Sequence, residues 1–494
     1  MRQDGRMPIT VRAGRGTAAR TAVLATITAA ALAVSACSSS GGLSSREKAV
    51  QSTNINVSTK QCGDKCTGVI DGAKYTIKLP QRWNGTLLLY SHGYRFAESG
   101  PPDFSPVDTN AQVDSTDSDG TGGDALAQQL LANGYALAGS SYKTNGWAVS
   151  DGVAAGEALH SLFVSLVGTP QRTYVWGDSL GGLITELISE QNPQWVDGAA
   201  PMCGAVAGPN LNFDAALDVA FATKALIDPA LKLTGYTSSA DADANWAHAA
   251  KLVEAAAADT AHGGTGKVLF IAALVDAPTK TKTFDGADVV SQVKANVVSL
   301  LTALAFGTAG RYEVEQRLGG DPSGNVKADY DSRISTSEAS LITTVGGNVT
   351  ADKKALDAEP RVVADQAARA KFITLGDPTG NLTAPTLTMH TEQDPLVLVS
   401  NERILADRVQ AQGKSGRLVQ LYVAPPASYP ETPGAPYGAG HCNFSDQQRE
   451  SLISTLDGWV REAVYPSAVG VAPSFGPGLD PTFVPLPWPS GATL

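Results

Sequence analysis

The sequence predicts an α/β protein in which a mostly parallel sheet is flanked by helices and interrupted by a large helical insertion. Short apolar runs alternate with amphipathic stretches between residues 75 and 202, and the alternation resumes at residue 385. Repeated strand–helix alternation requires crossover connections, which are typical of parallel sheets. Between about residues 204 and 382, long Ala-rich stretches with helical spacing replace this pattern, and they predict a mainly helical insertion.

The composition indicates a folded chain with an acidic surface. The chain has 494 residues, of which 43% are hydrophobic and 17% are charged. Average globular chains have about 25% charged residues, so the composition argues against a highly charged disordered chain. The net charge of −11 argues against broad nucleic-acid binding, because such binding needs cations to replace counterions. We therefore expect no nucleic-acid partner.

The changes of pattern divide the chain into six segments. In chain order we expect a signal peptide at 1–36, a flexible tether at 37–60, the first part of the α/β core at 61–203, a helical lid or cap at 204–383, the second part of the core at 384–464 and a Pro-rich strap at 465–494. Aromatic residues lie between the prolines of the strap, which favours an extended segment on the surface.

The individual elements follow from hydrophobic periodicity and length. We predict strands at residues 86–90, 135–139, 172–176, 196–202, 385–390 and 417–423, and we consider a further strand at 268–274. We predict helices at residues 123–133, 156–167, 183–189, 213–231, 289–306, 401–412 and 446–463. We expect no segment after residue 36 to be long and apolar enough to span a bilayer.

The N-terminus has the pattern of an export signal. Five arginines precede an uncharged run at 21–36, which is shorter than the roughly 20 residues of a membrane span and fits a signal h-region. The run ends at Cys37 in the order Val-Ser-Ala-Cys, which resembles the bacterial lipoprotein cleavage box. We expect Cys37 to be lipidated and the protein to be anchored to the outer face of the bacterial cell membrane. The alternative is an ordinary secretory peptide and a secreted protein.

A Gly-x-Ser-x-Gly motif at residues 177–181 is the sharpest chemical signal. It follows the predicted strand 172–176 and opens a helix, which is the setting that a nucleophile elbow requires. The flanking glycines suit so tight a turn. The turn would hold the Ser179 hydroxyl at a helix N-terminus, where the dipole favours developing negative charge. We predict Ser179 as a nucleophile; the alternative is a Gly-rich turn without chemistry.

A serine hydroxyl needs a base to take its proton, and His441 is the predicted base. It lies in a Gly-rich loop between the last predicted strand and the last helix. The other histidines considered as a base lie in a predicted helix, in the insertion or at a strand end: His160, His248, His262 and His390. A loop at the carboxyl edge of the sheet is the better place from which to reach a serine on another strand.

The third member of the site should fix the tautomer of the base and stabilise its cation. Asp394 follows directly after the predicted strand 385–390 and is our choice, with Asp377 and Glu392 as rivals. For the oxyanion we predict two donors, the backbone N–H groups of Leu180 and Tyr94. Tyr94 follows an early strand, in the loop Ser-His-Gly-Tyr.

These residues together resemble the α/β-hydrolase superfamily, which uses the same chain order of Ser179, Asp394 and His441. The resemblance implies an α/β-hydrolase fold with a lid, esterase- or lipase-like activity on a small-molecule ester and no cofactor. A large apolar lid would suit an apolar acyl group. Two alternatives stay open: a serine exopeptidase of the same fold, or a surface lipoprotein that binds without catalysis.

The cysteines point to an oxidising compartment. If Cys37 carries lipid, four remain, which allow three pairings: Cys62, Cys66, Cys203 and Cys442. We expect no metal site, because no matching Cys/His pair lies near residues 62–66. Cys442 directly after the histidine is similar to feruloyl esterases and tannases, which bond that cysteine to one preceding the nucleophile. Asp178 occupies that position here, so this comparison favours Cys203 as the partner.

Overall fold

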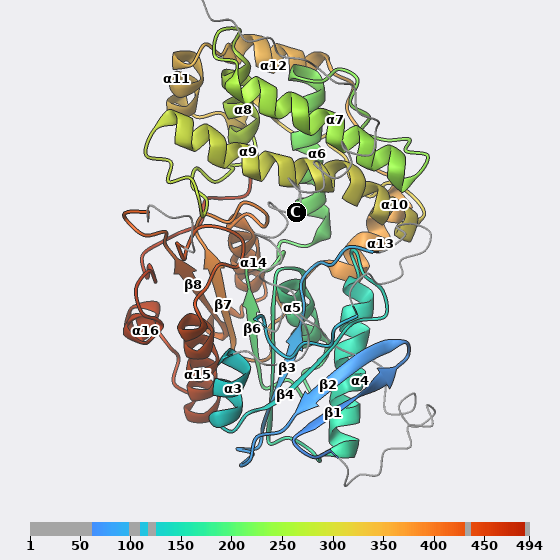
Figure 1. Cartoon of the computed structure of the whole chain (residues 1–494), viewed down its shortest axis with the longest axis vertical. Helices are drawn as coiled ribbons and strands as arrows, with labels where there is room; N and C mark the ends of the chain where they lie inside the picture. The colour runs from blue at the N-terminus through green and yellow to red at the C-terminus, as the bar shows by residue number, and fades with distance from the viewer. Residues whose placement is uncertain (1–61, 98–108, 117–124, 430–435, 490–494) are drawn as a thin grey trace, which may run out of the picture.

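One eight-stranded sheet forms the core of the chain (Figure 1). The computed structural model describes residues 62–97, 109–116, 125–429 and 436–489, so the predicted signal peptide and Cys37 lie outside the described residues. The strand order is β1-β2-β4-β3-β5-β6-β7-β8. The strands are β1 Lys65–Ile70, β2 Ala73–Lys78, β3 Thr86–Ser91, β4 Ala136–Ser140, β5 Arg172–Asp178, β6 Gly198–Met202, β7 Thr386–Thr391 and β8 Leu418–Val423.

The sheet is parallel from β4 to β8, whereas β1 pairs antiparallel with β2 and β2 pairs antiparallel with β4. The predicted strands 86–90, 135–139, 172–176, 196–202, 385–390 and 417–423 are confirmed. The hairpin β1–β2 was not singled out. It turns at Asp71 and Gly72, both with positive φ.

Two layers of helices cover the sheet because alternate residues of each strand face opposite sides. Leu87 and Leu89 face the side covered by α4 (Val149–Leu166) and α5 (Leu180–Gln191). Leu88 and Tyr90 face the side covered by two other helices, α3 (Ala125–Ala132) and α15 (Asp446–Glu462). The helix α14 (Ser400–Ala411) packs beside β8.

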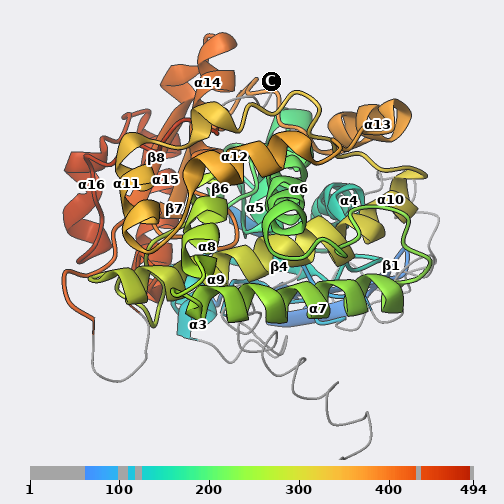
Figure 2. The same cartoon turned by 90° about the horizontal axis from the view of Figure 1, so that it is seen from above.

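A separate body of helices lies between β6 and β7 in the sequence and over one end of the sheet in space (Figure 1). Its helices are α6 Pro209–Leu226, α7 Ser239–Ala258, α8 Gly264–Ala273, α9 Val289–Ala305, α10 Arg311–Leu318, α11 Thr336–Thr344, α12 Val349–Ala358 and α13 Gln366–Gly376. We call this body the lid. Figure 2, a view from above, shows α6, α7, α8 and α12 together over the sheet.

The strand considered at 268–274 is wrong, because those residues belong to α8. Nearly the whole of α8 is buried in the lid's own hydrophobic core. A short apolar run without polar alternation fits a buried strand and a buried helix equally well. Tertiary packing inside the lid decides between them here.

The longest helical segment of the lid runs without a break from α9 through a π-helical turn at Phe306–Gly310 into α10. By length and composition alone, Val289–Leu318 could cross a membrane, so our expectation that no such segment follows residue 36 is wrong on that measure. In the structure, Leu300 and Leu304 of this segment pack in the lid core. We therefore describe it as the central helix of the lid.

The C-terminal segment is not extended throughout. Residues Ala468–Phe475 form α16, and Phe475 is fully buried in the same apolar cluster as α15. Pro473 lies inside this helix, which is why the sequence pattern did not indicate one. Beyond it the chain forms a bridge between Val423 and Leu479 and ends its described part near Trp488.

Candidate active site

Ser179 occupies the turn between β5 and α5. Its backbone has φ 61° and ψ −124°, a conformation that is costly for a non-glycine residue and is found where the surrounding structure enforces it. The Ser179 N–H donates a 2.9 Å hydrogen bond to Met202 O at the end of β6. Its side chain is almost completely covered, with 5% of the residue exposed.

The three glycines around Ser179 are required by close backbone contacts. A Cβ at Gly177 or Gly181 would overlap the carbonyl oxygen of Ser91, and one at Gly182 would lie 2.8 Å from Met202 O. These approaches bring the turn against the ends of β3 and β6. The glycines of the motif therefore have a steric reason that is independent of the chemistry.

His441 and Asp394 form a buried hydrogen-bonded pair. The His441 Nδ1 lies 2.7 Å from Asp394 Oδ2, and the two residues are 1% and 0% exposed. The other carboxylate oxygen of Asp394 accepts hydrogen bonds from the N–H groups of Leu396 and Val397, both at 2.9 Å. Asp394 is therefore held at both oxygens, and Nδ1 of His441 carries the proton that it donates.

The electrostatics keep Asp394 ionised. Burial by itself raises the pKa of this carboxyl, but the charge and hydrogen bond of His441 and the charge of His390 outweigh that effect. The net result is a pKa below the usual value. A carboxylate in this state can stabilise a cation on His441.

The two rival acids have other surroundings. Asp377 lies 3.5 Å from Arg408, and burial raises its pKa to about 6. Burial, followed by the charge of Asp480, raises the pKa of Glu392 to about 7. Asp394 is the carboxylate that the structure pairs with His441.

The loop that carries His441 is fixed by hydrogen bonds. Gly440 O accepts the Thr391 hydroxyl at 2.8 Å, and Gly440 N–H donates to Gln393 O at 2.9 Å. The Asn443 amide donates to Ala439 O at 2.9 Å. These bonds tie the loop to the end of β7, the strand that precedes Asp394.

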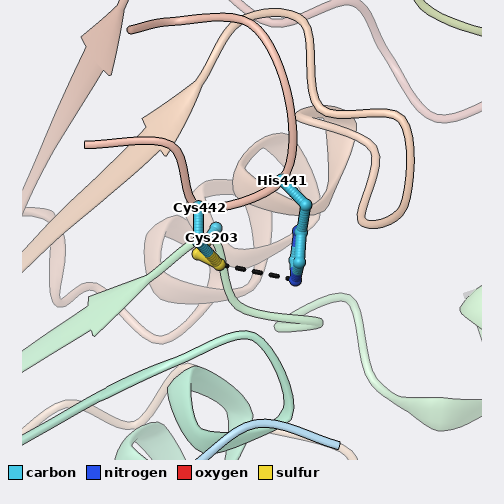
Figure 3. Close-up of side chains that lie close together, drawn as sticks. All are labelled: Cys203, His441 and Cys442. Atoms are coloured by element: carbon cyan, nitrogen blue, oxygen red, sulfur yellow. Dashed lines mark hydrogen bonds between the residues drawn. A yellow bond between two sulfur atoms is a disulfide. The ribbon is translucent and has the colours of Figure 1, made fainter. Parts of the chain in front are cut away.

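A disulfide joins Cys203, directly after β6, to Cys442, directly after His441 (Figure 3). The sulfur of Cys442 lies 3.4 Å from His441 Nε2. The second disulfide joins Cys62 and Cys66. Both pairings match the ones considered from the sequence.

Cys203, His441 and Cys442 bring three metal-ligating atoms within 4.8 Å of one another. Zinc is bound by thiolates, whereas the two sulfurs here are bonded to each other. The cluster in Figure 3 is therefore a disulfide beside an imidazole, and its residues do not fit a metal while the bond is intact.

Ser179 and His441 approach the same edge of the sheet. Ser179 is bonded to Met202, and the next residue, Cys203, is joined to the neighbour of His441. Burial raises the pKa of Asp178, and the charge of His441 is one of the weaker influences that lower it. The hydrogen bond from the Ser179 hydroxyl to His441 Nε2 stays a prediction.

Tyr94, Leu180 and Ser179 line one cavity of about 80 Å³. The preceding His92 is buried, and its ring stacks on Tyr142 with 3.6 Å between the ring centroids. Burial lowers the pKa of His92 well below the usual value, so this ring is neutral. His92 therefore packs under the loop that carries the backbone of Tyr94.

The cavity beside Ser179 is apolar and aromatic. Helices of the lid and loops of the core both line it, and all of the described lining residues are uncharged. The principal aromatic side chains are Tyr94, Trp147, Phe213, Phe306 and Trp488. Trp488 comes from the C-terminal segment, and sequence analysis missed it because no local pattern links it to a site 309 positions earlier.

The strand order and the nucleophile turn between β5 and α5, with a His–Asp pair following later strands, define an α/β-hydrolase fold.

No family model and no curated protein matches the chain. Solved structures that are similar include feruloyl esterase B and an esterase from Aspergillus oryzae. They are 14% and 13% identical, cover 82% of this chain and 81% of their own, and have TM-scores of 0.35 and 0.40. Tannin acyl hydrolase from Aspergillus niger is 11% identical over 82% of this chain and 79% of its own, with a TM-score of 0.36.

Proposed function

We propose that the protein is an exported serine hydrolase that cleaves carboxylic esters. The observation that carries the proposal is the 2.7 Å bond between His441 Nδ1 and Asp394, at the same sheet edge as a serine held at φ 61°. A strained serine after a buried strand has little structural value of its own, whereas it has a clear use as a nucleophile.

The reaction follows from which nitrogen of His441 carries the proton. His441 carries its proton on Nδ1, so the lone pair of Nε2 can accept the proton of the Ser179 hydroxyl as the oxygen attacks an acyl carbonyl. The backbone N–H groups of Leu180 and Tyr94 stabilise the oxyanion. The His441 cation then protonates the leaving alcohol, and water hydrolyses the acyl-enzyme by the same route.

The cavity favours an uncharged, apolar acyl group. An exopeptidase would need an acidic side chain to bind the free amine of its substrate, and the described residues that line this cavity are uncharged. Burial of apolar substrate surface contributes about 25 cal/mol per Å². The ester is therefore the better supported substrate, and the exopeptidase remains the alternative to be tested.

The proposed location is the outer face of the bacterial cell membrane, through lipid on Cys37. Two disulfides in the described chain are consistent with an oxidising compartment. Metabolic labelling with a palmitate analogue tests the anchor, since Cys37→Ala should abolish the label. Retention of the label in that variant would contradict a lipid on this residue.

A substrate panel tests the activity. It compares p-nitrophenyl esters of increasing chain length with aminoacyl-nitroanilides, on the wild type and on Ser179→Ala. We expect ester turnover that falls by about 10⁴-fold or more in Ser179→Ala. A fluorophosphonate probe separates the enzyme from a binding lipoprotein, because only an activated Ser179 is labelled. Preferential cleavage of the nitroanilides would favour the exopeptidase.

A further inference from the structure

A second buried histidine lies directly behind Asp394. His390 is in β7, and its Nε2 lies 3.6 Å from Asp394 Oδ2 and 2.9 Å from Val397 O. Its Nδ1 lies 3.2 Å from Glu402 Oε1, on α14. His390, Asp394 and Glu402 are all 0% exposed. The proposed catalytic pair thus continues inward as His441–Asp394–His390–Glu402.

The hydrogen-bond partners of His390 fix its protonation state. Val397 O can only accept, so Nε2 carries a proton. Glu402 Oε2 accepts bonds from the Thr388 hydroxyl and the Gln420 amide, both at 2.6 Å, as expected for a carboxylate. Because Glu402 already accepts two hydrogen bonds as a carboxylate, the proton between Glu402 and His390 belongs to Nδ1. His390 is therefore an imidazolium.

Other titratable groups lie around this cluster. They are Glu186 and Glu190 from α5, Tyr422 from β8, Arg403 from α14, and His441 from its loop. Burial, with Glu190 and Glu402, raises the pKa of Glu186 well above its usual value. Burial also raises the pKa of Tyr422, so both shifts favour the uncharged form of the group.

We propose that His390 and Glu402 are positioning residues that keep Asp394 an anion and set the protonation range of His441. Glu402 holds the imidazolium in place, and the imidazolium balances the buried charge of Asp394. This inference rests on the proposed function, because it assigns Asp394 to the catalytic site. Burial lowers the pKa of His390, but Glu402 and Asp394 outweigh it, and the net pKa is raised.

The proposal predicts the direction in which the pH dependence of activity changes. The active form has neutral His441 and ionised Asp394, and one added proton on either group inactivates it. Removing the nearby positive charge of His390 makes that proton easier to add. His390→Gln removes this positive charge directly. Glu402→Gln removes it indirectly, because His390 loses the carboxylate that holds its second proton and becomes neutral. The acid limb of activity therefore moves to higher pH in both variants, by about one pH unit.

The test measures the rate at which a fluorophosphonate probe labels Ser179 as a function of pH. It compares the full-length wild type with Glu402→Gln and His390→Gln, which remove charge and keep similar volume. We expect the midpoint of the acid limb to rise by about one pH unit in both variants. The labelling rate on the alkaline plateau should change less. The matched control is His262→Gln, an exposed histidine paired with Asp259, whose limb stays at the wild-type pH.

An unmoved midpoint in both variants, with labelling still dependent on Ser179, overturns the inference and leaves the proposed function intact. Absence of Ser179-dependent labelling in the wild type contradicts the proposed function itself. Nitrogen-15 NMR of histidine-labelled wild type decides the proton state even if the variants do not fold. One ring that keeps both N–H protons at a pH where the exposed histidines have lost theirs supports the proposal. Loss of a proton from every ring in the same pH range overturns it.

Discussion

The phenol of Tyr94 donates a 2.9 Å hydrogen bond to Glu313, and this bond joins the loop of a proposed oxyanion donor to the lid. Glu313 lies on α10, and it also accepts the Trp147 N–H at 2.9 Å. Arg317, one turn later, pairs with Glu313 at 2.5 Å and donates to Asn145 O. The position of the lid and the geometry of the Tyr94 loop are therefore coupled.

Glu313→Gln should weaken this coupling, because an amide cannot accept three hydrogen bonds and carries no charge for Arg317. We expect kcat to fall by about tenfold and the free energy of unfolding by about 1–3 kcal/mol. Tyr94→Phe keeps the backbone N–H and loses the same bond from the other side. Kinetics and thermal melts of both single variants and the double variant should show non-additive effects. Independent, additive losses would mean that the bond does not link the two elements.

Asp394→Asn should lower kcat/KM by about 10³- to 10⁴-fold, because the amide favours the wrong His441 tautomer and cannot stabilise its cation. Asp377→Asn is the matched control, since Asp377 pairs with Arg408. We expect its kcat/KM to stay within a few-fold of the wild type. A harmless Asp394→Asn together with a crippling Asp377→Asn would show that the acid is misassigned.

The size of the cavity predicts a change in chain-length preference. Ala303 of α9 lines the cavity of about 80 Å³, so Ala303→Phe should fill much of it. We expect kcat/KM for long-chain p-nitrophenyl esters to fall by about tenfold or more, and kcat/KM for the acetate to fall less. Val290→Phe on the same helix is the control, because Val290 is 64% exposed. An equal loss for all chain lengths in Ala303→Phe would indicate damage to the lid rather than to the acyl site.

Local patterns were sufficient to predict the strands β3 to β8 and to place Ser179, Asp394 and His441 after three of them. Each of these residues follows a strand, and the carboxyl ends of parallel strands meet at one edge. The glycines of the turn carry their own signal because a tight turn requires them. Motif, strand and helix therefore agree at this point in the chain.

No sequence motif indicates the residues that support the site from the strand interior, the lid and the C-terminal segment. A histidine inside a buried strand has the same sequence pattern as core packing, so the sequence does not distinguish His390 from a structural residue of its strand. Glu313 reaches Tyr94 across 219 positions, and Trp488 reaches the cavity from the C-terminal segment. Such contacts depend on how the lid and the tail pack, which periodicity does not encode.

The disulfide beside His441 should contribute more than the N-terminal one. Cys203–Cys442 closes a loop with a sequence separation of 239, whereas Cys62–Cys66 has a separation of 4. Loop-closure entropy predicts that loss of the long-range bond costs about 2–5 kcal/mol, and loss of the short one much less. The double variant Cys203→Ser/Cys442→Ser should therefore melt at a lower temperature and lose activity, because Cys442 adjoins His441. Cys62→Ser/Cys66→Ser is the control and should keep near wild-type turnover. Equal melting temperatures and equal turnover in the two double variants would show that the bond at the site neither stabilises the fold nor positions the histidine.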